Sequence, residues 1–256
     1  RFLSVILGTL LIPVLGNLGR RLFDRRVGAA TAAVVAVMPL AVYYSQEVRM
    51  YGLVTLLGAV SAYSFARINQ SKWRVVYIAA TTAAMYTMYY AAFVVLFQLL
   101  YRLIISPARP QKIIQRLRPF FFVGLFYLPW ILYAGPRLLS YIQNKRAVEG
   151  YLPLHIVRFA GDHFVAFSVG HLSEPLQGYA WLALPMALSA ALGVAAALSR
   201  PRRVWLYPML YLGVPLLAGY LVNQIYPFTP PYYERTLLLA APAWWLLIGA
   251  GIIWLW

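Results

Sequence analysis

Nine apolar stretches separated by short polar segments take up most of the chain, and this pattern limits the folds open to it. The stretches lie at residues 2–18, 27–44, 50–68, 75–88, 90–105, 119–137, 176–199, 204–222 and 236–256. Each is near the length of a helix that crosses a bilayer, about 20 residues at ~1.5 Å rise per residue. Because 62% of the residues are hydrophobic and 11% are charged, one water-soluble globule cannot enclose these side chains. The sequence therefore predicts an all-α, polytopic bundle of about nine transmembrane helices, with 1–256 as one domain.

The stretch 75–105 can be one long tilted helix or two shorter helices that meet near Tyr89 and Tyr90. The basic residues favour two helices. Four segments hold 15 of the 22 basic residues: 20–26, 67–74, 102–118 and 200–203. With two helices, all four segments fall on one side of the membrane, which the positive-inside rule assigns to the cytoplasm. We therefore expect a multi-pass protein of the cell inner or plasma membrane, with its active site facing outward.

The formal charge of +16 has the same explanation. The Lys and Arg residues form short runs between apolar stretches, which is typical of loops that flank membrane spans and contact anionic lipid. Membrane lipids are therefore expected partners, and nucleic acid is not. The chain has no cysteine, which excludes disulfides, thiolate nucleophiles and Cys-ligated metals. Residues 138–175 form the longest polar region, and we expect an outer cap of short amphipathic helices there.

The segment 43–51 joins two apolar stretches at the predicted outer boundary and is rich in polar groups. A carboxylate such as Glu47 is costly near hydrocarbon unless it is paired, hydrated or bound to a ligand. If the helix continues through the segment, Tyr43, Glu47 and Tyr51 share one face while Arg49 points elsewhere. That face could bind a polar ligand. Alternatively, Glu47 pairs with Arg49 and merely caps a helical hairpin.

A second polar segment, 226–235, comes directly before the last apolar stretch. Prolines interrupt its helical pattern, and aromatic residues, Tyr233 among them, surround the pair Glu234 and Arg235. Aromatic rings stack on sugar faces, and a guanidinium group can hold a phosphate through two parallel hydrogen bonds. The segment therefore predicts a mouth for a phosphate and a sugar. The alternative is an interfacial aromatic belt in which Arg235 snorkels to the membrane surface.

All three histidines lie in the predicted cap, near two acids; these residues are His155, His163, His171, Asp162 and Glu174. A spacing of eight residues between the histidines differs from the i,i+3 or i,i+4 placement that helical metal pairs usually need. We therefore favour ordinary interfacial histidines. No cofactor is assigned with certainty, and a divalent metal stays open.

Three segments resemble, in their order along the chain, outer motifs of GT-C type integral-membrane glycosyltransferases. The relatives in question are bacterial and similar to the protein O-mannosyltransferases and the lipid A aminoarabinose transferases. A helix that ends at 38–40 and runs into 44–51 is similar to the family's second outer acidic motif. The turn 86–90 resembles a short outward turn, in which the family often has a histidine where this chain has Met88. The segment 233–235 looks like a later outer loop, where an arginine faces the lipid phosphate.

This resemblance, which covers most of the chain, implies a reaction and a set of substrate contacts. It implies that a sugar passes from a polyprenyl-phosphate donor to a hydroxyl of a lipid, glycan or protein acceptor on the outer face. The acceptor oxygen attacks the anomeric carbon and the lipid phosphate leaves, with a carboxylate as general base and a cation stabilising the phosphate. Glu47 would be the second acid, which orients the acceptor or a metal, and Arg235 would bind the phosphate. The other implied substrate contacts are Arg49, Tyr44, Tyr51, Tyr89, Tyr90, Tyr233 and Glu234.

In such enzymes the principal catalytic acid lies in the first outer loop, after the first helix. This chain begins at Arg1 without a start Met and ends at Trp256 inside an apolar stretch, so we interpret it as an interior piece of a longer protein. We expect the general base to lie before residue 1.

Two other functions remain open from the sequence. A flippase for lipid-linked oligosaccharides, or another transporter, should carry polar residues or broken helices near the membrane midplane. Most polar groups of this chain lie at the ends of the apolar stretches instead. A structural membrane subunit without catalysis would tolerate the loss of Glu47 and Arg235.

Overall fold

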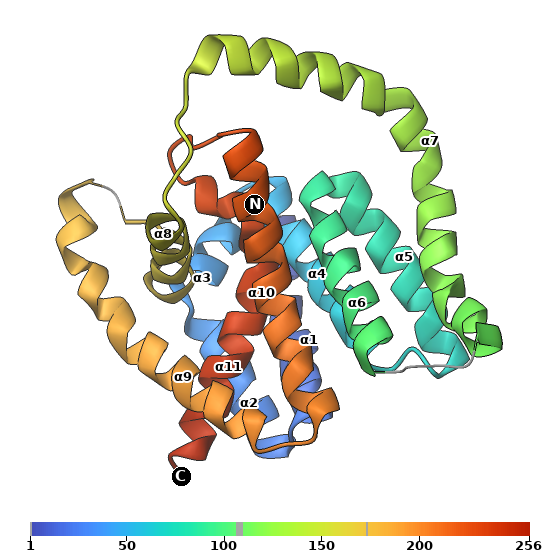
Figure 1. The fold of residues 1–256 in the computed structure, drawn as a ribbon. Coiled ribbons are helices and arrows are strands. Elements are labelled where there is room, and N and C mark those ends of the chain that lie inside the picture. The colour runs from blue at the N-terminus through green and yellow to red at the C-terminus, as the bar shows by residue number, and fades with distance from the viewer. Residues whose placement is uncertain (1, 106–109, 173) are drawn as a thin grey trace.

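The computed structural model describes residues 2–105, 110–172 and 174–256, and helices make up nearly all of these residues (Figure 1). The α-helices are α1 (Phe2–Leu22), α2 (Arg25–Val37), α3 (Pro39–Gln46), α4 (Met50–Phe65), α5 (Ser71–Thr87), α6 (Ala92–Ile105), α7 (Pro110–Glu149), α8 (Ile156–Val169), α9 (Leu184–Leu198), α10 (Arg202–Ile225) and α11 (Ala241–Trp254). Three 3₁₀ segments, η1 (Tyr89–Ala91), η2 (Glu174–Ala183) and η3 (Tyr233–Ala240), precede α6, α9 and α11. The described residues include no strand, which confirms the all-α prediction.

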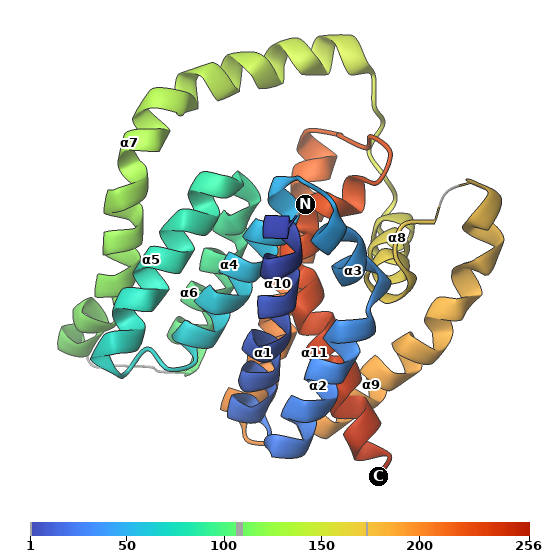
Figure 2. The same ribbon diagram turned by 180° about the vertical axis from the view of Figure 1, so that it is seen from behind.

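The connections lie at two opposite ends of the bundle (Figures 1 and 2). The links 23–24, 66–70 and 199–201, with the Arg and Lys residues that flank them, lie at one end, called here the basic end. The links 47–49 and 226–232 lie at the other, the aromatic end, together with the turn between α5 and α6. The predicted separation of basic and polar segments is therefore present in the fold.

Each of the nine predicted apolar stretches falls on helical structure, and the stretch 75–105 contains two helices, as predicted. Chain direction reverses there because Met88 is extended, between the end of α5 and the start of η1. By length and composition, five described helices can cross a membrane. The pair α2 and α3, bent by 55°, makes a sixth if it counts as one span. The protein is thus a multi-pass membrane protein, and the count of nine stays a prediction.

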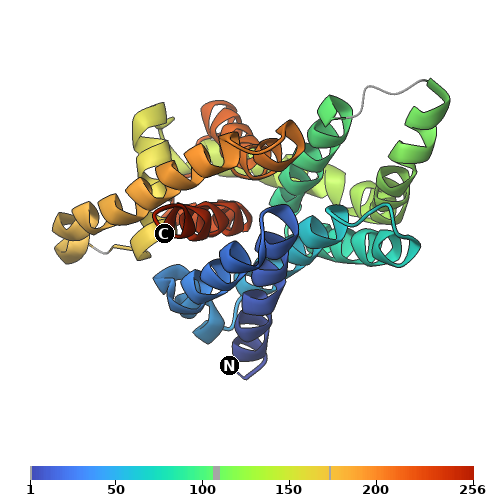
Figure 3. The same cartoon turned by 90° about the horizontal axis from the view of Figure 1, so that it is seen from below.

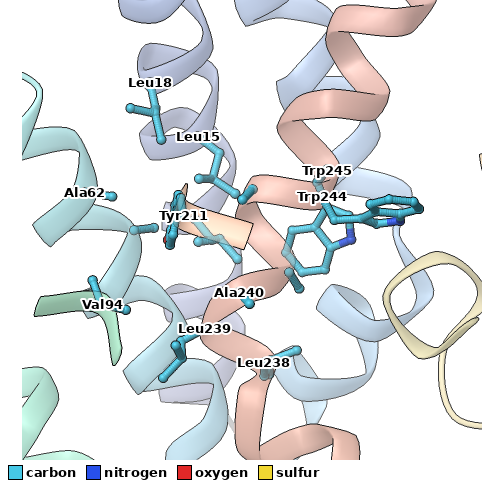
Figure 4. Close-up of a cluster of buried hydrophobic side chains, with 14 of the residues drawn as sticks. Leu15, Leu18, Ala62, Val94, Tyr211, Leu238, Leu239, Ala240, Trp244 and Trp245 are labelled. Atoms are coloured by element: carbon cyan, nitrogen blue, oxygen red, sulfur yellow. The ribbon is translucent and has the colours of Figure 1, made fainter. Parts of the chain in front are cut away.

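Helix α11 occupies the centre of the bundle, between α9 and α10 on one side and α1 and α2 on the other (Figure 3). It is apolar all round and buries the run from Ala241 to Gly251, as a helix in the middle of a bundle must. Its start, with η3, packs beside Leu15 of α1, Val94 of α6 and Tyr211 of α10 (Figure 4). The core therefore fixes the position and the orientation of η3, which continues directly into α11.

Helices α4, α5 and α6 share a buried network of hydrogen bonds. The Gln98 amide donates to Ser61 Oγ at 2.9 Å, and Tyr77 donates to Gln98 Oε1 at 3.0 Å. The hydroxyls of Ser61 and Thr81 lie 2.7 Å apart. Polar side chains away from water are stable only when such partners are present, so this network fixes α5 and α6 against α4.

Helix α7 extends into the region that was predicted to form the outer cap. It rises beside α5, passes three prolines and then bends across the aromatic end (Figures 1 and 2). The predicted cap of short amphipathic helices at 138–175 is corrected for residues 138–149, which belong to the long helix α7. That helix ends at Glu149, and the next residue, Gly150, has a positive φ of 57°. Among the described residues of this region, the short helical elements are α8 and the start of η2.

Candidate functional site

The backbone leaves the helical conformation between α3 and α4. Glu47 is extended at φ −89° and ψ 130°, and Arg49 is extended at the start of α4. The prediction that Tyr43, Glu47 and Tyr51 share one helical face is therefore wrong. Tyr43 is 47% exposed, whereas Tyr44 is 3% exposed, and the Tyr44 ring lies 5.2 Å from that of Tyr51.

Glu47 and Arg49 form the ion pair that the alternative hypothesis proposed, with Arg49 Nε 3.1 Å from Glu47 Oε1. The Arg49 side chain is 54% exposed and the Glu47 side chain 25% exposed. An ion pair that is open to solvent contributes little to stability, about 0–1 kcal/mol. The pair therefore leaves the partly exposed Glu47 carboxylate accessible to a ligand.

Arg235 reaches the same place from η3. Its guanidinium carbon lies 5.7 Å from the centre of the Tyr51 ring, within the range of a cation–π contact. Among the residues that the structure describes, Arg235 forms no ion pair. The Tyr44 hydroxyl interacts electrostatically with both Glu47 and Arg235. The structure thus places the two polar segments singled out from the sequence around one pair of tyrosines.

His171 completes this arrangement, although its sequence pattern does not single it out. Its Nε2 atom lies 2.7 Å from the Tyr44 hydroxyl, and its Nδ1 atom lies 3.6 Å from Glu234 Oε2. The His171 side chain is 5% exposed and that of Glu234 is 15% exposed. The Tyr232 ring packs on the imidazole at 4.7 Å, with the Tyr232 backbone in the left-handed region at φ 60°. His171 therefore joins α3 to η3.

The position of His171 follows from how α8 is attached. The indole N–H of Trp245 donates to the Phe167 carbonyl at 2.8 Å, and that of Trp244 donates to Ser168 Oγ at 3.0 Å. The next turn needs Gly170, whose φ of 86° suits glycine and whose absent side chain leaves room for Pro39. Two bonds from α11 and one glycine therefore direct the chain after α8 toward Tyr44.

Tyr233 makes its contacts with α8. Its hydroxyl donates to Asp162 Oδ2 at 2.9 Å, and its ring lies against Phe159 and His163. Asp162 also lies 3.8 Å from Arg158, one helical turn earlier. Tyr233 thus fixes the entry of η3 against α8, a role that the sequence alone did not indicate.

Tyr89 and Tyr90, the other predicted substrate contacts, lie in η1, which packs against η3 at the aromatic end. Their rings pack together at 4.8 Å, and Tyr90 also lies 5.5 Å from Phe93. Tyr226 interacts electrostatically with Tyr90. These tyrosines border the loop that leads to Arg235.

The three histidines have separate surroundings. His155 caps α8 by accepting the Val157 N–H at 3.3 Å, and His163 bonds the Phe159 carbonyl through Nδ1 at 2.7 Å. Within the described ranges, no three His, Asp or Glu side chains lie close enough together to hold a metal ion. The Glu174 side chain, part of the metal hypothesis, lies outside the described side chains.

Burial lowers the pKa of His163 below its ordinary value of 6.5, against smaller opposite effects of the Phe159 carbonyl, Glu234 and Asp162. The unfolded chain therefore binds a proton at higher pH than the folded chain does. The stability that neutral His163 provides is complete above pH 6.5 and declines as the pH falls below that value, by at most ~1.4 kcal/mol per pH unit.

We expect the thermal midpoint of the detergent-solubilised protein to fall between about pH 7.5 and about pH 5.5, and to fall less in His163→Phe. The control is His155→Asn, which removes an exposed histidine while keeping a side chain that can cap α8. Equal pH dependence in the wild type and His163→Phe would contradict this prediction.

Comparison with known proteins identifies the family of this chain. Residues 1–133, just over half of the chain, match the family model described as dolichyl-phosphate-mannose-protein mannosyltransferase. The chain belongs to this mannosyltransferase family. The matched region contains Glu47, Tyr51 and the turn with Tyr89 and Tyr90, and it ends before α8 and Arg235. The resemblance drawn from the sequence motifs is therefore confirmed at the level of the family.

The fold of this family member is similar to a solved structure, that of ArnT from Cupriavidus metallidurans in the apo state. The TM-score is 0.64 at 15% identity, and the match covers 98% of this chain. It covers 44% of the ArnT chain, so the mannosyltransferase-family chain spans less than half of that protein's length. No protein of curated function matches the sequence significantly.

Proposed function

We propose that this chain forms part of a glycosyltransferase that moves a sugar from a polyprenyl-phosphate carrier to an acceptor hydroxyl. The observation that carries the proposal is that Arg235 lies over the Tyr51 ring, which packs against Tyr44, three residues before Glu47. An accessible acid, a guanidinium without an ion pair among the described residues and aromatic rings are the groups that such a substrate needs. Membership of a mannosyltransferase family supports the same reaction class.

The phosphate of the donor is assigned to Arg235. Its planar guanidinium can hold two phosphate oxygens at once, and the Tyr51 ring below it limits its directions. Helix α4 begins at Met50, and its N-cap residue, Arg49, makes no side-chain capping bond. The first backbone N–H groups of α4 therefore remain available to an anion near Tyr51.

The reaction proposed for this site breaks one bond and forms one. The acceptor hydroxyl attacks the anomeric carbon, and the bond from that carbon to the phosphate oxygen breaks. Arg235 stabilises the charge that develops on the leaving phosphate, while Glu47 orients the acceptor hydroxyl or a metal ion. The proton of the hydroxyl passes to a carboxylate that acts as general base.

The aromatic rings are proposed as the walls of the sugar site. Tyr51 lies under Arg235 and packs against Tyr44, and the Tyr232 ring packs on His171. Tyr89 and Tyr90 extend the aromatic surface across η1. Arg49 and Glu234 take part by holding Glu47 and His171 in place.

Orientation in the membrane follows from charge. The basic end is proposed to face the cytoplasm of a cell inner or plasma membrane, by the positive-inside rule. The aromatic end then faces the periplasm or the cell exterior. A lipid, glycan or protein acceptor would meet the donor there.

The first test is transfer of a radiolabelled sugar from polyprenyl-phosphate donors by the intact protein in membranes. We expect donor-dependent transfer, reduced about tenfold to a hundredfold in Glu47→Gln, because the amide keeps the shape but loses the charge that orients the acceptor. Asp24→Asn is the matched control. Asp24 is also an acid paired with an arginine, Arg200 at 3.4 Å, but it lies at the basic end.

Two results would contradict the proposal. Absence of transfer with every donor, in a folded wild type, would favour a transporter or a structural subunit. Full activity in Glu47→Gln would remove Glu47 from the site and favour the reading in which its pair with Arg49 only shapes the link between α3 and α4.

A further inference from the structure

A polar cavity lies at the basic end, opposite to the candidate active site. It has a volume of ≈ 470 Å³ and opens between the ends of α1, α4, α6 and α10. Three arginines from three helices line it: Arg21, Arg102 and Arg203. Its other side chains include Phe65, Tyr101 and Tyr207, whose rings pack together.

Among the described residues, no acid neutralises the charge of this cavity. No carboxylate is among its lining residues, and in the described part of the chain its three arginines make no ion pair. Asp24, an acid of the same end, is engaged elsewhere: it caps α2 through the Arg26 and Val27 N–H groups and pairs with Arg200. The cavity therefore attracts an anion.

Arg102 gives the most direct sign of a ligand. Its Nε atom is buried and has no hydrogen-bond partner among the described residues. A buried guanidinium N–H without an acceptor is costly, about 1–3 kcal/mol or more for a charged group. An anion oxygen in the cavity would supply the acceptor.

The surroundings identify the class of anion. Guanidinium groups on separate helices match the oxygens of a phosphate, which accepts bonds from several directions. Leu22, Ile105 and Val204 add apolar side chains to the wall, and the cavity lies where the helices of the bundle end. Basic pockets between such helices suit phospholipid headgroups. We infer that this cavity binds the phosphate headgroup of an anionic phospholipid.

Such a lipid would act at a distance from the transfer reaction. Tyr101 donates to the Arg203 carbonyl at 2.7 Å, so the cavity wall already joins α6 to α10. A headgroup held by Arg21, Arg102 and Arg203 would add α1 to this junction. The site depends on the basic end alone, so it stands whether or not the proposed transferase activity is correct.

The test is a titration of the intact protein in detergent with dioleoyl phosphatidylglycerol, followed by native mass spectrometry. We expect saturable binding, an apparent Kd raised about tenfold or more in Arg102→Gln/Arg203→Gln, and weak binding of dioleoyl phosphatidylcholine. Arg118→Gln is the control, because Arg118 lies over the Phe122 ring of α7 and does not line the cavity. Its Kd should equal that of the wild type.

Three outcomes would overturn the inference. They are an unchanged Kd in the double variant, equal affinity for the two phospholipids, and binding of inorganic phosphate as tight as that of phosphatidylglycerol, which would mean a free-anion site. Thermal midpoints would show whether the variants are folded. If Arg102→Gln does not fold, the exposed Arg21 and Arg203 carry the test through Arg21→Gln/Arg203→Gln.

Discussion

Replacing Arg235 by alanine is expected to lower sugar transfer by about a hundredfold to a thousandfold, the usual cost of losing one group that stabilises charge in a transition state. The loss should appear in kcat more than in KM, because the phosphate gains charge only as the glycosidic bond breaks. The Arg235→Ala variant should still fold. The Arg235 guanidinium lies over the face of the Tyr51 ring and forms no ion pair among the described residues, so its loss leaves no buried charge without a partner. The measurement is the steady-state rate of transfer from a polyprenyl-phosphate donor.

Two further variants show whether the loss comes from phosphate binding. Arg235→Lys keeps the charge but not the planar fork, so we expect part of the activity to return. Arg200→Ala removes an arginine of the basic end, where it pairs with Asp24, and should leave transfer unchanged. Equal activity of Arg235→Ala and the wild type, in folded protein, would exclude Arg235 from the reaction.

The two charged residues of this site, Glu47 and Arg235, could be predicted from the sequence, because charged side chains are costly next to apolar membrane helices unless they have a function. Glu47 and Arg235 interrupt apolar patterns, and both lie at the aromatic end. The pattern could not show that they surround the same tyrosines. That proximity depends on α11, which enters the centre of the bundle and places η3 beside α4.

The local geometry of the site was less predictable. Periodicity assigned Tyr43 to the face of Glu47 and Tyr51, but this holds only in an unbroken helix. The extended residues at the link turn the chain, so Tyr44 takes the inner position. No glycine or proline lies within the link 47–49. Gly52, three residues further on, lies so close to the Tyr44 carbonyl that a side chain there would crowd the turn.

His171 shows a different limit. It lies 127 residues from Tyr44 along the chain, and its spacing from the other histidines gave no indication of a contact. The available signal was Gly170 directly before it, at the end of an amphipathic stretch, which predicts the end of a helix. Which residues would receive His171 depends on the Trp244 and Trp245 bonds that position α8.

Helix boundaries agree with the apolar pattern except at positions where the backbone conformation ends or bends a helix. The stretch 27–44 contains a bend of 55° because Met38, the residue before Pro39, is extended. The proline marks that bend in the sequence. Conversely, α7 continues through Pro119, Pro129 and Pro136 into the predicted cap, bending rather than ending. The apolar pattern predicted where helices lie, and backbone conformation decided where they turn or stop.

Replacing Gly251 by alanine is expected to destabilise the bundle by about 2 kcal/mol or more. A methyl group at Gly251 would overlap the Ser189 carbonyl of α9, and one at Gly193 would overlap the Leu247 carbonyl of α11. Backbone atoms cannot turn away as a side chain can, so the two helices must separate, and small residues are what permit close packing in membranes. The measurement is the unfolding of the purified protein in a denaturing detergent.

The matched control is Gly213→Ala in α10, where an added methyl group meets no atom within 4 Å. Alanine favours helix over glycine, so this variant should be neutral or slightly more stable. Because α11 carries η3 and the two tryptophans that hold α8, Gly251→Ala should also lower transfer. Equal stability of Gly251→Ala and Gly213→Ala would contradict this prediction, because it would mean that the close contact of α9 and α11 does not stabilise the bundle.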